Sequence, residues 1–238
     1  MSQPRTVVFL DFDGTITLQD ATDAILDAFA DPGWLQVEDA WLSGQIGSRE
    51  CLAAQMALVT ATRDQVDRLL DVIGVDPGFA LLLDICAARA VPVHVVSDGF
   101  DYCIARILGR PALNLLGRLA DSHIVSSSLR PERGRWRAAF AHPPEACAHG
   151  CATCKPAAMK SLNAADAVTV FVGDGMSDRY AAAYADVVFA KDKLAAFCNT
   201  ASIPYTGFET LTTVALSLER LLSAGLHRSL SGKVLPTV

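Results

Sequence analysis

Short apolar runs recur along the chain, and each run ends in a small polar or acidic cluster. A short run that is apolar on both faces is typical of a strand buried in a parallel sheet. Segments of helical spacing separate the runs, and this alternation predicts an α/β fold, a Rossmann-like parallel sheet flanked by helices. Two further strand-like runs around a turn predict a hairpin at 124–140. The four clearest apolar runs lie at 7–10, 91–96, 167–172 and 187–190.

Helical spacing alone fills the stretch between the first two runs. A helical block of this length exceeds the few residues of an ordinary connection. We therefore predict a core of residues 1–16 and 91–238 with an inserted helical cap of residues 17–90, whose last helix belongs either to the cap or to the core. Ser48 is a good N-cap for one of these helices. The cap helices are predicted at 20–29, 34–42, 48–58 and 63–73.

Composition narrows the class of protein. The chain has 238 residues, of which 51% are hydrophobic, and this fits one large domain or a core with a smaller insert. A net charge of −6 and a sequence pI near 5.3 argue against nucleic acid and anionic membranes as partners. The sequence has neither a leader pattern nor a membrane-spanning apolar run. We expect a cytoplasmic protein, a monomer or a homodimer.

Two carboxylates follow the first apolar run on a tight loop. Asp11 ends the predicted strand, Asp13 lies just past it, and Gly14 lets the backbone turn. In open α/β sheets, ligands bind at this end of the strands. Two like charges so close together favour a proton or a divalent cation between them. An ordinary surface turn is the alternative, because the same residues also suit a loop.

A second acidic loop follows the run at 167–172. It carries Asp174 and Asp178 in the sequence Gly-Asp-Gly-Met-Ser-Asp. Hard cations prefer oxygen ligands. Asp11, the backbone carbonyl of Asp13, and Asp174 would supply three of them. The two loops together favour a Mg²⁺ site over two unrelated turns.

A hydroxyl group and an amine are placed to hold an anion at the same end of the sheet. Ser97 follows the run at 91–96, and the backbone N–H groups of Asp98 and Gly99 come next, before a predicted helix. Lys155 precedes Pro156 at the start of another predicted helix, where an ammonium group can hold a phosphate. A plain helix N-cap is the alternative for Ser97.

Three of the seven cysteines cluster at Cys147, Cys151 and Cys154. Three thiolates with an imidazole from His149 or His142 form the ligand set of a structural Zn²⁺. No second spaced pair accompanies them in the sequence, so a redox-active pair and simple packing are alternatives. The other cysteines are expected to be small buried residues in a reducing compartment.

These segments resemble, in order and spacing, the four motifs of the haloacid dehalogenase superfamily of phosphatases. The helical block after the first motif is similar to the cap of the phosphoserine-phosphatase-like branch. Within that branch, the Cys-rich approach to Lys155 and the segment 189–192 resemble the 2-hydroxy-3-keto-5-methylthiopentenyl-1-phosphate phosphatases of methionine salvage. Residues 52–55 lack the L-R-x-R that phosphoserine phosphatases carry in the cap. The four motifs correspond to 11–15 (D-x-D-G-T), Ser97, Lys155 and 173–178 (G-D-G-x-x-D).

The resemblance implies a mechanism and a role for each carboxylate. Asp11 is expected to attack phosphorus and to form an aspartyl-phosphate. Asp13 is expected to protonate the leaving oxygen and then to activate water. Mg²⁺ is expected at Asp11, Asp13 and Asp174, with Asp178 supporting it through water.

The resemblance also implies where the substrate lies and what it is. The expected substrate is a small phosphorylated metabolite, in first place 2-hydroxy-3-keto-5-methylthiopentenyl-1-phosphate. Phosphoserine, phosphocholine and a sugar phosphate are alternatives, and so is a zinc-bound or protein-binding module that keeps the fold. The phosphoryl group is expected at Ser97, Asp98, Gly99 and Lys155. The cap residues expected to select the leaving group are Asp20, Trp34, Trp41 and Arg49.

Overall fold

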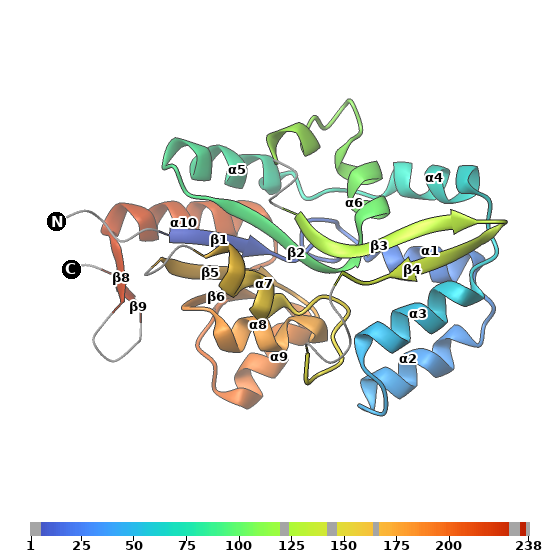
Figure 1. Ribbon diagram of the computed structural model, residues 1–238. Coiled ribbons are helices and arrows are strands. Elements are labelled where there is room, and N and C mark those ends of the chain that lie inside the picture. Colours follow the sequence, from blue (N-terminus) through green and yellow to red (C-terminus); the bar gives the residue numbers. More distant parts are fainter. Residues whose placement is uncertain (1–5, 120–123, 142–146, 164–166, 229–233, 237–238) are drawn as a thin grey trace.

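The structure is a computed structural model of residues 1–238 that describes residues 6–119, 124–141, 147–163, 167–228 and 234–236 (Figure 1). A seven-stranded sheet in the order β4-β3-β2-β1-β5-β6-β7 forms its centre. All neighbouring strands are parallel except β3 and β4, which form the predicted hairpin. The strands are β1 (Thr6–Leu10), β2 (Val93–Phe100), β3 (Ile124–Glu132), β4 (Arg135–Ala139), β5 (Val168–Gly173), β6 (Val187–Ala190), β7 (Thr206–Gly207) and a separate pair, β8 (Leu226–Arg228) and β9 (Val234–Pro236).

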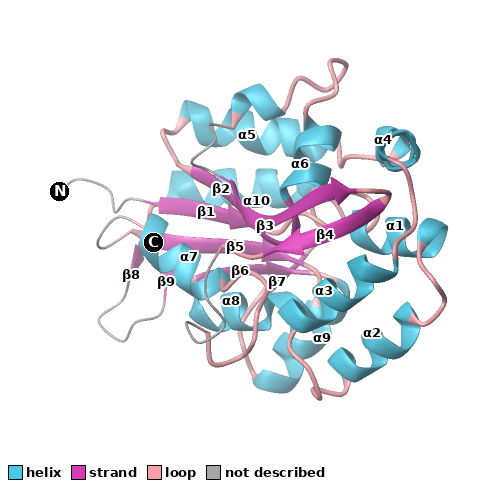
Figure 2. Cartoon of the chain, turned by 45° about the vertical axis from the view of Figure 1, so that its right-hand side comes forward, coloured by secondary structure: helices cyan, strands magenta, loops and turns pink. Residues whose placement is uncertain are grey.

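Helices cover both faces of the sheet, so the predicted α/β architecture is confirmed. α5, α6 and α10 pack on one face, and α7, α8 and α9 pack on the other (Figures 1 and 2). The α-helices among the described residues are α1 (Ala21–Phe29), α2 (Trp34–Leu42), α3 (Ser48–Leu58), α4 (Arg63–Val72), α5 (Gly78–Ala88), α6 (Asp101–Leu108), α7 (Lys155–Leu162), α8 (Arg179–Tyr184), α9 (Asp192–Ala201) and α10 (Leu211–Ala224). Two short 3₁₀ turns are η1 (Leu116–Arg118) and η4 (Met176–Asp178).

β1 is an enclosed strand, because it lies between two parallel neighbours and under helices on both sides. Its alternate residues face opposite layers: Val8 and Leu10 pack toward α5 and α10, and Val7 and Phe9 pack toward α7, α8 and α9. All five of its residues are buried. Burial of a Leu or Phe side chain contributes roughly 2 kcal/mol, so the strand that carries the first acidic loop is firmly fixed.

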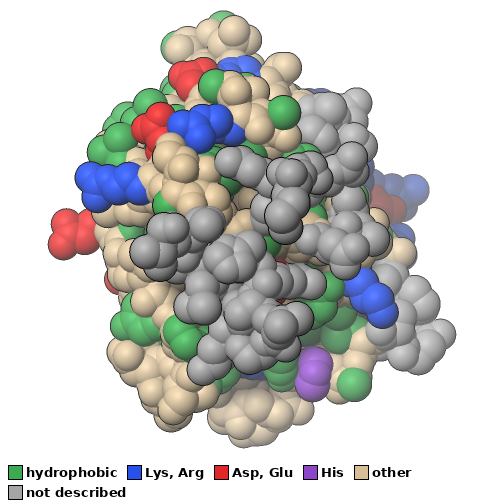
Figure 3. Space-filling model, turned by 90° about the vertical axis from the view of Figure 1, so that its left-hand side faces the viewer, with side chains coloured by type: hydrophobic (Ala, Val, Ile, Leu, Met, Phe, Trp, Pro, Cys, Tyr) green, Lys and Arg blue, Asp and Glu red, His purple; other side chains and the backbone are tan. Residues whose placement is uncertain are grey.

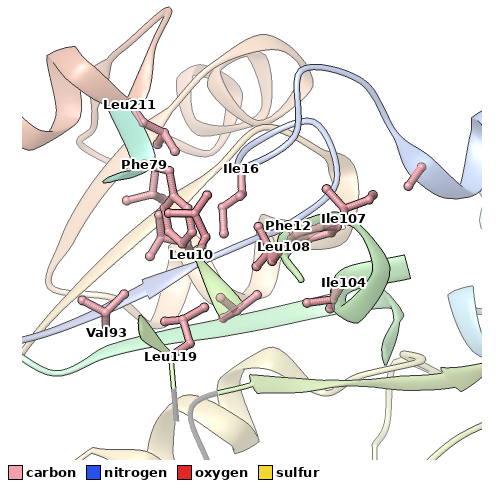
Figure 4. Packing of buried hydrophobic residues seen from close by; sticks show 14 of the residues in the cluster. Leu10, Phe12, Ile16, Phe79, Val93, Ile104, Ile107, Leu108, Leu119 and Leu211 are labelled. Atoms are coloured by element: carbon pink, nitrogen blue, oxygen red, sulfur yellow. The ribbon is translucent and has the colours of Figure 1, made fainter. Parts of the chain in front are cut away.

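The same alternation continues past the end of β1. Figure 4 shows Phe12 beside Ile107 and Leu108 of α6, within the hydrophobic cluster. Because Phe12 turns into this cluster, the flanking side chains of Asp11 and Asp13 turn the other way. A buried aromatic anchor therefore holds the two carboxylates out of the core.

The helices α1 to α4 lie at the right of Figure 1, past the carboxyl ends of β1, β2 and β5, with α3 packed against β4 and α4 against α6. α5 differs from them, because its Phe79 packs against Leu10 of β1 and near Leu211 of α10 (Figure 4). α5 therefore covers the sheet, whereas α1 to α4 stand over the end of it. The division of the chain into core and cap stays a prediction.

The opposite end of the molecule, where the strands begin, carries basic and acidic side chains next to one another (Figure 3). Within the described ranges, no helix is both long enough and apolar enough to cross a membrane. Of the C-terminal segment from residue 229, the structure describes residues 234–236.

Candidate active site

The sheet order brings the two acidic loops together. β1 lies between β2 and β5, so the loops that follow these three strands meet at one edge of the sheet. One carboxylate oxygen from each of Asp11, Asp174 and Asp178 lies within 4.8 Å of the others. A cavity of about 400 Å³ opens beside them, between the sheet and the helices α1 to α3. This edge is therefore the candidate active site.

Lys155 ties the two acidic loops together. Its Nζ lies 2.8 Å from Oδ1 of Asp11 and 2.5 Å from Oδ1 of Asp178, and its side chain is 1% exposed. Burial acts to lower the pKa of the ammonium group, but the charges of Asp11, Asp178 and Asp98 outweigh it and raise the pKa above its ordinary value. Lys155 is therefore a fixed positive charge, placed at the first residue of α7 with Pro156 after it.

Asp13 is held by the first turn of α1, whose Ala21 N–H donates to its Oδ1 at 2.9 Å. Loss of water contact raises the pKa of Asp13 well above its usual range, and the neighbouring charges of Asp20 and Asp11 add to this effect. Gly99 lies directly under this carboxylate, because a Cβ at that position would overlap Oδ2 of Asp13. The close approach requires glycine.

The second acidic loop is fixed by hydrogen bonds of its own. Thr15 Oγ1 donates to Oδ1 of Asp174 at 2.5 Å, and the N–H groups of Asp174 and Gly175 donate to Oδ2 of Asp178 at 3.1 Å each. Burial and the charge of Asp11 raise the pKa of Asp174 to about 6 and that of Asp178 to about 8. These carboxylates carry more negative charge than Lys155 balances. Oxygen donors in negative excess fit a hard divalent cation such as Mg²⁺.

Ser97 lies within β2, which continues to Phe100, further than the sequence predicts. The register of β2 against β3 shifts between Val96 and Phe100, and this irregularity turns Ser97 and Gly99 toward the site. Ser97 is buried, and its Oγ accepts the N–H of Gly99 at 2.9 Å. The helix predicted after this segment, α6, accordingly begins at Asp101.

The side chain of Asp98 is engaged by hydrogen bonds of its own at the cavity wall. Its carboxylate accepts the hydroxyl of Ser48 at 2.6 Å and the N–H of Thr153 at 3.0 Å. The N–H of Ala152 in turn donates to Oγ of Ser48 at 2.9 Å. These contacts join the start of α3 to the loop before α7, and only the backbone N–H of Asp98 is left as a candidate for phosphate contact.

Two of the four expected cap residues line the cavity. Asp20 and Trp41 do so, whereas Trp34 packs against the hydrophobic cluster and the guanidinium of Arg49 lies 4.8 Å from the ring centre of Phe140. Burial, with the charge of Asp23 second, raises the pKa of Asp20 to about 7. Which cap residues line the cavity depends on the direction of each side chain, and helical spacing alone does not predict that direction.

Several residues of the cavity wall are not among the site residues predicted from the sequence. Gln55 of α3 is buried, and its Nε2 donates to Glu38 of α2 at 2.9 Å. Ser48, Cys51 and Gln55 recur at helical spacing along one side of α3, and all three line the cavity. A polar residue on the otherwise buried side of a helix is the signal that could have identified Gln55.

The three clustered cysteines lie on the segment before Lys155, outside the group of three carboxylates. Among the described residues, the group of Asp11, Asp174 and Asp178 alone brings three potential metal-binding side chains within 4.8 Å of one another. The ring of His149 stacks on Tyr180, with 3.9 Å between the ring centres. His142, the other histidine considered for zinc, lies outside the described residues.

Known proteins share this sequence pattern. A family model described as haloacid dehalogenase-like hydrolase matches residues 8–183. A relative from Geobacillus thermodenitrificans, named 2-hydroxy-3-keto-5-methylthiopentenyl-1-phosphate phosphatase, is 30% identical over 220 residues, which cover 91% of this chain and 97% of the relative. A relative of the same name from an Exiguobacterium species is 28% identical over 213 residues, covering 88% and 95%.

Solved structures share the fold. A phosphoserine phosphatase described as a phospho-aspartyl intermediate analogue matches with a TM-score of 0.63 at 17% identity, covering 91% of this chain and 99% of that one. A hydrolase from Salmonella enterica serovar Typhi matches with a TM-score of 0.67 at 15% identity, covering 89% and 70%. At these identities the likeness concerns the fold.

Proposed function

This chain belongs to the haloacid dehalogenase-like hydrolase family, and from that premise we propose that it hydrolyses 2-hydroxy-3-keto-5-methylthiopentenyl-1-phosphate. It is a phosphoric monoester hydrolase, as its relatives are named. The observation that carries the proposal is the buried Lys155 between Asp178 and Asp11, of which Asp11 lines the cavity. The names of the relatives support the choice of substrate.

We propose that Asp11 is the nucleophile. Its carboxylate attacks phosphorus, the ester oxygen leaves, and Asp13 donates the proton that the leaving alcohol needs. Asp13 then takes a proton from water, which attacks the aspartyl-phosphate and releases inorganic phosphate and free Asp11. The hydrogen bond from Ala21 N–H supports this role, because it holds the Asp13 carboxylate beside the cavity.

The remaining site residues would bind the metal ion and the phosphoryl group. Asp11, the carbonyl of Asp13, and Asp174 would bind Mg²⁺, with Asp178 behind them, and the bound ion would offset charge on the phosphoryl oxygens. The carboxylate oxygens of Asp11, Asp174 and Asp178, which lie within 4.8 Å of one another, support the carboxylate part of this ligand set. The phosphoryl group would contact Ser97, Lys155, and the N–H groups of Asp98 and Gly99.

The cavity wall supports a leaving group without a carboxylate. The described lining residues include Asp20, Asp23 and Glu38 from the cap side, with Lys193 as a balancing cation, and no arginine. A carboxylate on the substrate would be repelled by the three acids. The hydroxyl and keto groups of the methylthiopentenyl substrate suit such a wall, because they can accept or donate hydrogen bonds without charge.

Phosphocholine is the second candidate substrate. Trp41 lies in the same wall as the acidic residues. An aromatic face combined with carboxylates is a common environment for a quaternary ammonium group. The two candidates differ in the charge of the leaving group, so a substrate panel separates them.

We further propose that the protein acts in the cytoplasm on a small phosphorylated metabolite, as a monomer or a homodimer. Seven free thiols support a reducing compartment. A structural Zn²⁺ at Cys147, Cys151 and Cys154 is supported by donor chemistry alone.

The test is phosphate release in the presence of Mg²⁺ from the methylthiopentenyl substrate, phosphoserine, phosphocholine and sugar phosphates. We expect the methylthiopentenyl substrate to have the highest kcat/KM. Asp11→Asn should lower turnover by at least about a thousandfold, because the nucleophile is lost. Asp84→Asn is the matched control, since Asp84 is 70% exposed on the surface and pairs with Arg118. Asp11→Asn with near-normal turnover would exclude the mechanism, and a better phosphocholine rate would change the substrate.

A further inference from the structure

The cavity beside the carboxylates has a single basic side chain in its described wall. The described lining residues include eight carboxyl groups, and Lys193 is the one lysine or arginine among them. The other lysine of the site, Lys155, is 1% exposed and lies between Asp11 and Asp178, which balance its charge. A phosphomonoester that enters from solvent is therefore repelled by most of the wall and attracted by Lys193.

The backbone on both sides of Lys193 is bonded to the second acidic loop. The N–H of Lys191 donates to Gly173 O at 3.3 Å, and the N–H of Leu194 donates to Asp174 O at 2.7 Å. The side chain of Leu194 is buried, whereas Lys193 is exposed. The start of α9 is thus held beside Asp174, and the ammonium group of Lys193 remains accessible to solvent and to a ligand.

The chain takes an uncommon turn between the two lysines that follow β6. Asp192 has a φ of 47°, in the left-handed region that few residues other than glycine adopt, although aspartate adopts it more readily than most. Lys191, before this turn, places its ammonium group 5.4 Å from the ring centre of Phe208. Lys193, after the turn, lines the cavity. The local backbone therefore directs one of the two lysines to the site.

The charge of Lys193 also reaches the cap side of the cavity. Asp23 lies in the first turn of α1 and lines the same cavity. Burial and the charge of Glu38 raise the pKa of Asp23, and the positive charge of Lys193 acts in the opposite direction. The backbone of Lys193 thus belongs to the core, while its ammonium group acts on groups on both sides of the cavity.

We propose that Lys193 is a substrate-binding residue, whose exposed ammonium group attracts the phosphoryl group of a phosphomonoester into the acidic cavity and stays beside it in the complex. This inference rests on the proposed function and adds a residue to the same site. The phosphoryl group is anionic in the bound substrate and in the transition state, so Lys193 stabilises both. Its removal should therefore appear chiefly in KM.

A latch between the core and the cap side is the competing explanation. If Lys193 serves only to hold Asp23, and α1 with it, removal of either charge should loosen the cap side in the same way and raise KM. If Lys193 serves the substrate, Asp23→Asn should lower KM, because a carboxylate that repels phosphate and competes for the ammonium group is gone. The direction of the change in Asp23→Asn therefore separates the two explanations.

The experiment compares the full-length, Mg²⁺-loaded wild type with Lys193→Gln, Lys193→Arg and Lys160→Gln. Lys160 is the matched control, because it is exposed on α7. The readouts are KM and kcat for the best phosphomonoester of the panel, and the Kd of inorganic phosphate by calorimetry. Lys193→Gln should raise KM and the phosphate Kd by about tenfold, with kcat within about twofold of the wild type.

Charge rescue and salt dependence are readouts that a merely structural role would not change. Lys193→Arg should restore both constants, because it restores the positive charge. The KM of the wild type should rise with salt and approach that of Lys193→Gln at about 1 M, where the Debye length is about 3 Å. The Tm of Lys193→Gln should stay within about 2 °C of the wild type, because an exposed charge contributes little to stability.

Three results would overturn the proposal. The first is a KM and a phosphate Kd in Lys193→Gln that equal those of Lys160→Gln. The second is a rise of both constants in Asp23→Asn that matches the rise in Lys193→Gln, as a latch requires. The third is a wild type that does not bind inorganic phosphate. If no phosphomonoester is hydrolysed, the proposed function fails, while calorimetry with inorganic phosphate still decides whether Lys193 attracts the anion.

Discussion

At the scale of single residues, the site consists of buried charged side chains in which the carboxylates outnumber the one buried ammonium group. Lys155 is fully enclosed with Asp11 and Asp178, and Asp13 and Asp174 add further carboxylates. Removing one partner from a buried pair leaves an uncompensated charge, which costs several kcal/mol. The glycines beside these charges are also needed for the site, because the carboxylates pack directly against glycine backbone.

Gly99→Ala should inactivate the enzyme with little change in fold. The new Cβ would overlap the carboxylate of Asp13 and lie 3.1 Å from Oγ of Ser97, so both groups must shift. We expect kcat to fall by about a hundredfold. Gly117→Ala is the matched control, because the nearest atom to its Cβ is 3.9 Å away. Steady-state kinetics and circular dichroism measure the effect, and a variant as active as the control would contradict the expected overlap.

At the scale of elements, side chains from one segment hold the ends of another. Asp101 opens α6 and binds β3 through Ser128 Oγ at 2.9 Å and Leu129 N–H at 3.0 Å, with Arg130 alongside. Trp136 of β4 donates its indole N–H to Ala61 O at 3.0 Å. The hairpin is thereby fixed to helices on two sides.

Asp101→Asn should lower stability in a pH-dependent way. Burial acts to raise the pKa of Asp101, but the bonds from Arg130, Leu129 and Ser128 outweigh it and bring the pKa below 3.8. A carboxyl with a lowered folded pKa contributes stability above its unfolded pKa and loses it as the pH falls through the folded value. The side chain is 34% exposed, so we expect about 1 kcal/mol at pH 7.

Urea unfolding of both proteins from neutral to acidic pH measures this difference. The gap in unfolding free energy should be constant near neutrality and should shrink below a pH of about 4. A gap that grows as the pH falls would have the wrong sign for the proposed interaction.

The contact between α3 and the loop before α7 is a second place where one element holds another. Ser48→Ala removes the hydroxyl that donates to Asp98 and accepts from Ala152. A buried polar group that loses its hydrogen-bond partner destabilises the structure by about 1–3 kcal/mol. We therefore expect kcat/KM to fall by about tenfold, because α3 is held less firmly against the loop before α7. Ser161→Ala is the control, because its exposed hydroxyl bonds only within α7. Equal kinetics for the two variants would show that the contact does not serve turnover.

At the scale of the whole molecule, strand order decides where the chemistry lies. β1 sits at the centre of the sheet with β2 and β5 beside it. Segments 11–15, 97–99 and 173–178 thereby meet, and Lys155 closes the group from α7. The helices α1 to α3 then stand over this edge and enclose the cavity.

Mg²⁺ should stabilise the entire chain, because it binds the assembled carboxylates and not the unfolded chain. At a free concentration a hundredfold above Kd, the gain is about 2.7 kcal/mol, or about 5–10 °C in Tm. Thermal unfolding after chelation and after Mg²⁺ return measures this shift, and turnover should disappear and return with it. Asp174→Asn should reduce the shift. A Tm indifferent to Mg²⁺ in the wild type would argue against the ligand set.

The sequence by itself determined the elements and the chemical character of their ends. Continuous apolar runs predicted the strands around 7–10 and 167–172, and helical spacing predicted the helices of the cap side. Two strand-like runs around a turn predicted the hairpin at 124–140. All of these patterns are local. The acidic and glycine-rich loops that follow buried strands indicated a cation site and an anion site. These loop motifs are also local in the sequence. The roles of the individual site residues remain predictions.

Only the tertiary structure decided which way particular side chains face. Ser48 is the first residue of α3, after the N-cap Gly47, and its hydroxyl serves Asp98 instead of its own helix. Trp34 packs inward while Trp41 lines the cavity, and α5 covers the sheet instead of the site. These outcomes depend on partners that lie dozens of residues away along the chain. A local pattern fixes period and turn chemistry, but long-range packing selects the contact that each side chain makes.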